Sequence, residues 1–202
     1  MSSSARSIES GRRQRGLLFI VSAPSGTGKT TLVERLVQMT PHLRMSRSYT
    51  SRPARAGERD GVDYNFITRD RFEVMIREGA FLEYAVIYGN YYGTLKSEID
   101  KALHAGKSML FDVDVKGALS IKQRYPAEGV LIFVKPPSIE ALTERLKARK
   151  TEDAETIRRR LERVPMELEQ AKEFEVCIVN DDLQRAVDAV DAVVNRVLPV
   201  AA

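Results

Sequence analysis

The chain of 202 residues is long enough for one compact α/β domain with a small insertion and a buried core. Its 43% hydrophobic and 30% charged content is typical of a globular protein, and no apolar run approaches the roughly 20 residues that cross a bilayer. The sequence therefore predicts no membrane partner. The net charge of +4 does not favour a nucleic-acid partner either, because the basic segments lack interleaved aromatic side chains.

Apolar runs alternate with amphipathic stretches along most of the chain. The runs are rich in Val, Ile, Leu and Phe, as in strands buried on both faces, and the stretches show helical spacing. We expect a doubly wound parallel sheet with helices on both faces and its ligand at the carboxyl ends of the strands. The expected strands are Leu17–Ser22, Ser108–Val113, Val130–Val134 and Val176–Val179, and the expected helices are Lys29–Met39, Arg69–Glu78, Leu95–Ala105, Lys116–Arg124, Ser138–Ala148, Ala154–Lys172 and Leu183–Val197, the last capped by Asp181 or Asp182.

Three segments depart from this alternation. Residues 1–15 are rich in Ser and Arg and predict a disordered basic tail before a domain over residues 16–197. Residues 46–94 hold many turn-forming residues with aromatics between them, which predicts a β-containing insertion. Residues 136–165 open with two prolines and predict a helical pair with an exposed, charged turn. The core is then expected over residues 16–45, 95–135 and 166–197.

The cysteine and histidine residues of this sequence predict neither a disulfide nor a zinc site. The single cysteine, Cys177, excludes an internal disulfide and fits a cytoplasmic location. It lies in the apolar run Val176–Val179, so we expect a buried structural residue and not a nucleophile. The two histidines, His42 and His104, have no partners at metal-ligand spacing, and the sequence predicts no zinc site.

The segment Ala23–Thr30 joins the first expected strand to the first expected helix. It reads Ala-Pro-Ser-Gly-Thr-Gly-Lys-Thr and departs from the phosphate-binding pattern G-x-x-x-x-G-K-[ST] at Ala23 alone. Backbone N–H groups of such a loop and the positive end of the helix converge on an anion. Lys29 can neutralise β- and γ-phosphate charge and the Thr30 hydroxyl can hold Mg²⁺, so a nucleoside triphosphate is the expected ligand. An ordinary glycine-containing loop is the alternative interpretation.

The sequence of the insertion narrows the choice of reaction. The run Ser46–Glu58, followed by Asp63–Phe66, resembles the acceptor-binding segment of guanylate kinases. Further motifs of that family follow in family order, at Phe81–Tyr84, Gly89–Thr94, Asp112–Asp114 and Val179–Asp182. The resemblance implies an α/β P-loop nucleoside monophosphate kinase with an inserted GMP-binding subdomain and a helical lid. It also implies ATP-dependent phosphorylation of GMP and dGMP in purine nucleotide metabolism, with Mg²⁺ and with ATP as co-substrate.

The residue types of the insertion suit this acceptor. Paired guanidiniums can clamp a dianionic phosphate bidentately, and the resemblance gives that role to Arg52 and Arg55, with donors from the Tyr64 and Tyr92 hydroxyls. Guanine presents two adjacent donors, N1–H and the N2 amino group, and one carboxylate can accept both. Glu83 is the family-matched carboxylate; alternatively it is a surface glutamate and the arginines form a solvated loop. The residues expected to assist Glu83 are Ser48, Thr94 and Asp114.

The donor side follows from the same resemblance. Asp112 would reach Mg²⁺ through water, although it or Asp114 could simply end a strand or cap the next helix. Asn180 would contact adenine, unless it is a loop or capping residue. The family's lid arginines would stabilise charge on the transferring phosphoryl group. The expected catalytic residues are Lys29, Arg52, Arg145, Arg149 and Arg160, the expected ATP-binding residues are Ala23, Pro24, Ser25, Gly26, Thr27, Gly28, Lys29, Thr30, Thr31 and Asn180, and Arg158, Arg159 and Arg163 are expected to be helix-surface charges.

Other functions stay open at this stage. A non-catalytic guanylate-kinase-like binding module would keep the fold but lose loop or lid residues, which this chain retains. A kinase of the same architecture could use another acceptor, such as a phosphorylated ribose. The basic tail could bind nucleic acid, and a homo-oligomer is compatible with the sequence.

Overall fold

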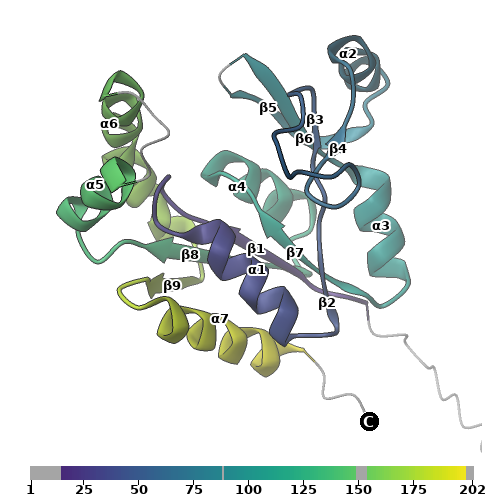
Figure 1. The fold of residues 1–202 in the computed structure, drawn as a ribbon. Helices are drawn as coiled ribbons and strands as arrows, with labels where there is room; N and C mark the ends of the chain where they lie inside the picture. Colours follow the sequence, from purple (N-terminus) through teal and green to yellow (C-terminus); the bar gives the residue numbers. More distant parts are fainter. Residues whose placement is uncertain (1–14, 88, 149–153, 199–202) are drawn as a thin grey trace, which may run out of the picture.

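The structure, a computed structural model, describes residues 15–87, 89–148 and 154–198, which form two sheets and their covering helices (Figure 1). The larger sheet has five parallel strands in the order β2-β7-β1-β8-β9, and the smaller has the order β4-β3-β6-β5. The expected α/β core is therefore confirmed. The elements are β1 Leu18–Ser22, α1 Lys29–Met39, β2 Leu43–Met45, β3 Tyr49–Thr50, β4 Asn65–Phe66, α2 Arg69–Arg77, β5 Phe81–Ile87, β6 Asn90–Leu95, α3 Lys96–His104, β7 Ser108–Asp112, α4 Val115–Arg124, β8 Gly129–Lys135, α5 Ile139–Ala148, α6 Ala154–Gln170, the 3₁₀ turn Ala171–Glu173, β9 Val176–Val179 and α7 Leu183–Val197.

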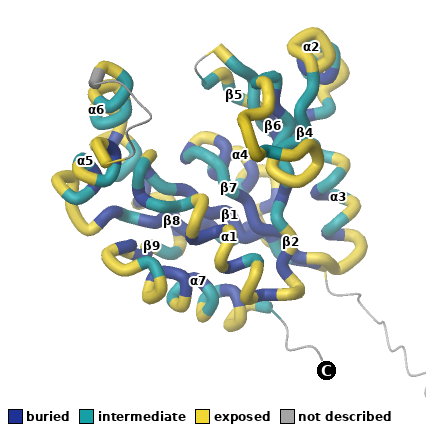
Figure 2. Tube along the Cα trace, in the orientation of Figure 1, coloured by how far each residue is buried: buried dark blue, intermediate teal, exposed yellow. Residues whose placement is uncertain are grey.

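The parallel sheet is packed on both faces. Successive side chains of a strand point to opposite faces, and all five residues of β1 are buried. Leu18 and Ile20 join a cluster with α3 and α4, whereas Phe19 and Val21 join a second cluster with α1 and α7. Figure 2 shows this sheet as the most buried part of the chain, with the exposed residues on the loops and outer helix faces. The two clusters hold the carboxyl ends of the strands in a fixed array.

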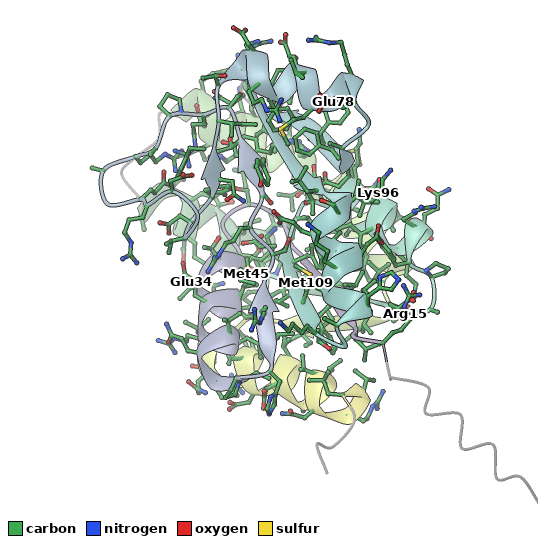
Figure 3. All side chains as sticks on the ribbon, turned by 90° about the vertical axis from the view of Figure 1, so that its right-hand side faces the viewer. Arg15, Glu34, Met45, Glu78, Lys96 and Met109 are labelled. Atoms are coloured by element: carbon green, nitrogen blue, oxygen red, sulfur yellow. The ribbon has the colours of Figure 1, made fainter. Side chains whose placement is uncertain are left out.

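That array places the phosphate-binding loop beside the end of β7. Val21 of β1 lies in register with Asp112 of β7, so the loop that leaves β1 starts next to the Asp112 carboxylate. On the other side of β7, β2 pairs with it in parallel, with Met45 opposite Leu110 and Arg44 opposite Met109; Figure 3 labels Met45 on β2. The insertion and the pair α5–α6 stand on either side of the core in Figure 1.

The insertion has a small core of its own. The Phe72 ring of α2 is fully buried and stacks on Phe81, with ring centroids 4.2 Å apart, and on Tyr91, at 5.0 Å. Thr68 begins α2 by accepting a hydrogen bond from the Arg71 backbone N–H. This cluster supports the β5–β6 hairpin, whose other face turns toward the core.

Several details differ from the sequence-based expectations. The strand β2 was not expected, because three residues are too few to show a period. Helix α6 ends at Gln170 and continues as a 3₁₀ turn, and Asp182, not Asp181, caps α7 by accepting from the Arg185 N–H. The expected burial of Cys177 is wrong: β9 is an edge strand, and Cys177 is exposed while its neighbour Ile178 packs inward. No helix in the described ranges is long and apolar enough to cross a membrane.

Candidate active site

A cavity of about 820 Å³ lies where the phosphate-binding loop, the insertion and α6 meet. Its size suits small-molecule ligands, and it extends along α1 to the end of β2. It brings together most of the predicted site, whose residues are spread from Ala23 to Arg160 in the sequence. The predicted residues that line it are Ala23, Pro24, Ser25, Gly26, Gly28, Lys29, Thr30, Thr31, Ser48, Arg52, Arg55, Tyr64, Glu83, Tyr92, Asp112, Asp114 and Arg160.

The loop conformation depends on two glycines. Gly26 and Gly28 have φ values of 91° and 92°, in the left-handed region that other residues rarely adopt. A Cβ on Gly26 would lie 2.7 Å from Cδ2 of Leu146, and one on Gly28 would lie 2.9 Å from Nδ2 of Asn180. Ala23 precedes this turn, so its replacement of the usual glycine leaves the anion-binding turn intact.

Lys29 and Thr30 both meet the Asp112 carboxylate at the end of β7. The Lys29 ammonium forms an ion pair with Asp112 and donates to the Val113 carbonyl at 2.7 Å, and the Thr30 hydroxyl donates to the same carboxylate at 3.2 Å. A hydroxyl and a carboxylate are ligands that Mg²⁺ prefers. Within the described residues, no group of three or more His, Cys, Asp or Glu side chains could hold a metal. These two oxygen groups therefore fit an ion that takes its other ligands from water and phosphate.

Arg145 and Asn180 stabilise the phosphate-binding loop through hydrogen bonds to its backbone. The buried Asn180 side chain donates from Nδ2 to the Thr27 carbonyl at 2.7 Å, and Arg145 donates from Nη1 to the carbonyls of Thr27 and Asn180. Neither side chain lines the cavity, so both support the loop from outside it. The contact of Asn180 with adenine stays a prediction. Arg160 of α6 reaches the loop directly, donating to the Ser25 hydroxyl at 2.6 Å. The remaining predicted lid arginine, Arg149, lies outside the described residues.

Within the insertion, Arg52 is oriented by its ion pair with Glu58. Its two terminal nitrogens donate to the two carboxylate oxygens of Glu58, each at 2.9 Å, and Nη1 also donates to the Pro53 carbonyl. The guanidinium lies 5.5 Å from the centroid of Tyr64, a cation–π distance. Glu58 also accepts from the Arg55 N–H at 2.7 Å. The hydrogen bonds from Arg52 lower the pKa of Glu58, and the same pair raises the pKa of Arg52.

The predicted guanine-type subsite is built around Glu83 on β5. The buried Thr94 hydroxyl donates to Oε1 of Glu83 at 2.7 Å. Burial raises the pKa of Glu83, the Thr94 hydrogen bond opposes this shift, and the nearby Asp114 charge adds to it. Asp114 lines the cavity, as a residue that assists Glu83 would. It also caps α4 by accepting from the Gly117 N–H at 2.8 Å, as the alternative interpretation expected.

Three site residues were missed or misjudged from sequence. Glu58 was part of a quoted motif but received no role; a carboxylate three residues after a predicted phosphate-binding arginine was the available signal. Arg163 is exposed, as expected of a helix-surface charge, but it also lines the cavity with Glu167, 3.6 Å away. The pKa of Glu167 is raised by burial, against the opposing charge of Arg163. Arg163 follows Arg160 by three residues, so the two share a face of α6, and both line the cavity. Arg158 and Arg159 are exposed and pair with Glu155, as expected.

Known proteins are similar to this chain in sequence and in fold. The family model of guanylate kinase matches residues 15–197. The guanylate kinase of Chlorobaculum tepidum is 49% identical over 185 residues, covering 92% of this chain and 95% of that protein, and that of Neisseria gonorrhoeae is 46% identical, covering 86% and 84%. The crystal structure of guanylate kinase from Anaplasma phagocytophilum aligns with a TM-score of 0.73 at 27% identity, covering 91% of this chain and 86% of that one.

Proposed function

Because the chain belongs to the guanylate kinase family, we propose that it transfers the γ-phosphoryl group of ATP to GMP, giving ADP and GDP. The observation that supports the proposal is a single cavity lined by both the phosphate-binding loop and the Glu83 carboxylate. Two nucleotides bound in this cavity would meet near Lys29 and Asp112, which also line it. We extend the proposal to dGMP as an acceptor, to purine nucleotide metabolism and to a cytoplasmic location.

The donor is held by charge and backbone dipoles. The loop N–H groups and the start of α1 bind the β- and γ-phosphates of ATP, and Lys29 adds a positive charge. Thr30 and Asp112 would hold Mg²⁺, which when bound neutralises phosphate charge. Arg160 reaches the loop from α6, where a guanidinium stabilises charge on the transferring group.

The acceptor needs orientation and no general base. Arg52 and Arg55 bind the GMP phosphate, and the Tyr64 and Tyr92 hydroxyls donate to its oxygens. An attacking phosphate oxygen is already anionic near neutral pH, so positioning and charge stabilisation carry the transfer. Glu83 accepts from N1–H and the N2 amino group of guanine; adenine presents an acceptor at N1, which would face the carboxylate unfavourably.

The test is a coupled assay of ADP production with GMP, dGMP, AMP, UMP, CMP and dTMP. GMP is expected to be the preferred acceptor, and another preference would refute the substrate assignment. ATP-dependent turnover also excludes the binding-module alternative. Lys29→Met removes the ammonium from the phosphates and should lower kcat by at least about 100-fold, as losses of charge stabilisation do. The control is Lys101→Met, an exposed lysine of α3 outside the cavity, which should leave kcat unchanged. Wild-type turnover by Lys29→Met would refute the mechanism.

A further inference from the structure

Glu83 lies against the first turn of α4, at Gly117. An ideal Cβ placed on Gly117 would lie 3.2 Å from Oδ1 of Asp114, 3.3 Å from Oε2 of Glu83 and 3.4 Å from Cβ of Val113. The two oxygen distances are shorter than an unstrained contact of a methyl group, about 3.5 Å. A methyl group at this position would therefore push on both carboxylates that face the guanine-type subsite.

Neither the backbone nor helix propensity explains this glycine. Gly117 lies within α4 and is not among the glycines with positive φ, so alanine could adopt its backbone conformation. Glycine inside a helix costs about 1 kcal/mol relative to alanine. The helical backbone at position 117 therefore favours alanine. An alanine there would, however, displace the Glu83 and Asp114 side chains.

We propose that Gly117 is a specificity-determining residue that acts through Glu83. Its missing side chain lets Oε2 of Glu83 rest against the positive end of α4 while Oε1 accepts from Thr94, so the carboxylate is fixed from both sides. Both oxygens are then directed for the two adjacent donors of guanine. This inference rests on the proposed use of Glu83 for guanine.

Inosine monophosphate provides the probe, because hypoxanthine keeps N1–H and lacks the N2 amino group. A carboxylate moved by a few tenths of an ångström cannot align with two donors at once, but it can still meet one. The variant Gly117→Ala should therefore lose more kcat/KM with GMP than with inosine monophosphate. The expected fall in the ratio of the two kcat/KM values is about tenfold, the value of much of one charge-assisted hydrogen bond.

The experiment measures kcat/KM for both acceptors at saturating ATP, the KM for ATP, and Tm, on the full chain. Ser120→Ala is the matched control, because it adds an alanine at an exposed position of the same helix and also raises the helix propensity, although by less. Gly117→Ala should lower the acceptor ratio, leave the KM for ATP unchanged and keep Tm at or above the wild-type value. An unchanged ratio overturns the inference, as does a fall in Tm with equal losses for both acceptors.

A second pair of variants tests whether the effect of Gly117→Ala acts through Glu83. In a Glu83→Ala background the carboxylate is absent, so adding Gly117→Ala should change the acceptor ratio no further. Independent effects of the two substitutions on the ratio would overturn the inference. If wild-type protein does not phosphorylate GMP, the proposed function fails with it; if it does and the ratio is unmoved, this inference alone fails.

Discussion

Replacing Glu83 by glutamine should lower kcat/KM for GMP without lowering the Tm of the protein. The amide has the shape of the carboxylate, but one of its two polar atoms donates. In the structure Oε1 already accepts from Thr94, so the amide oxygen is expected to keep that partner. The amide NH₂ then takes the place of Oε2 and faces one of the two guanine donors, so that hydrogen bond to guanine is lost.

The magnitude follows from these contacts. A hydrogen bond to a charged group contributes about 1.5–3 kcal/mol, so the lost bond costs about that much. At about 1.36 kcal/mol for each factor of ten, kcat/KM for GMP should fall roughly 10- to 160-fold. Stability should move the other way. Burial raises the pKa of Glu83, so its ionised form disfavours the folded state at neutral pH, and a neutral amide removes that cost.

The assay varies GMP at saturating ATP and records Tm for the same preparations. Glu78→Gln is the control, because Glu78 is exposed at the end of α2 (Figure 3) and does not line the active-site cavity. Glu83→Gln should keep a wild-type KM for ATP and a Tm at or above that of wild type. A kcat/KM for GMP within threefold of wild type would refute the role of Glu83 in guanine recognition.

Three further predictions concern pH, the loop and the insertion. As pH falls through the raised pKa of Glu83, its protonation should raise the KM for GMP at a pH above the ordinary glutamate range; Glu83→Gln should lack this component of the KM–pH profile. Arg145→Ala removes the hydrogen bonds to the Thr27 and Asn180 carbonyls, so the KM for ATP should rise about tenfold in steady-state assays while the KM for GMP is kept. Phe72→Ala leaves a cavity between two stacked rings, and urea titration should show a loss of about 3–5 kcal/mol in the free energy of unfolding; a loss below about 1 kcal/mol would contradict this packing.

What could be predicted from sequence was mostly local along the chain. The phosphate-binding loop depends on consecutive residues between one strand and one helix, and its two positive-φ glycines lie where the motif places them. The residues predicted to bind the acceptor needed several motifs in family order, because Arg52, Glu83 and Asp114 come to line one cavity only when the insertion folds back on the core. Family resemblance thus supplied contacts that periodicity alone could not.

What could not be predicted depends on which face of an element is covered. The run Val176–Val179 reads as buried, but β9 is an edge strand and its Cys177 faces outward. Arg163 has the sequence surroundings of a surface charge, yet the turn of α6 that carries it faces the cavity. Composition around a residue cannot distinguish these cases, since the decisive neighbours lie far away in sequence.

The charged residues of the site are held in place without using up their donors. Lys29 gives two of its three N–H donors to Asp112 and Val113, which leaves one for phosphate. Three of the five N–H donors of Arg52 go to Glu58 and Pro53. If these cations bind phosphate as predicted, their ion pairs need not be broken first. Because the side chains are already oriented, little conformational entropy would remain to be lost on binding, and the carboxylates would act as supports for the cations predicted to contact each nucleotide.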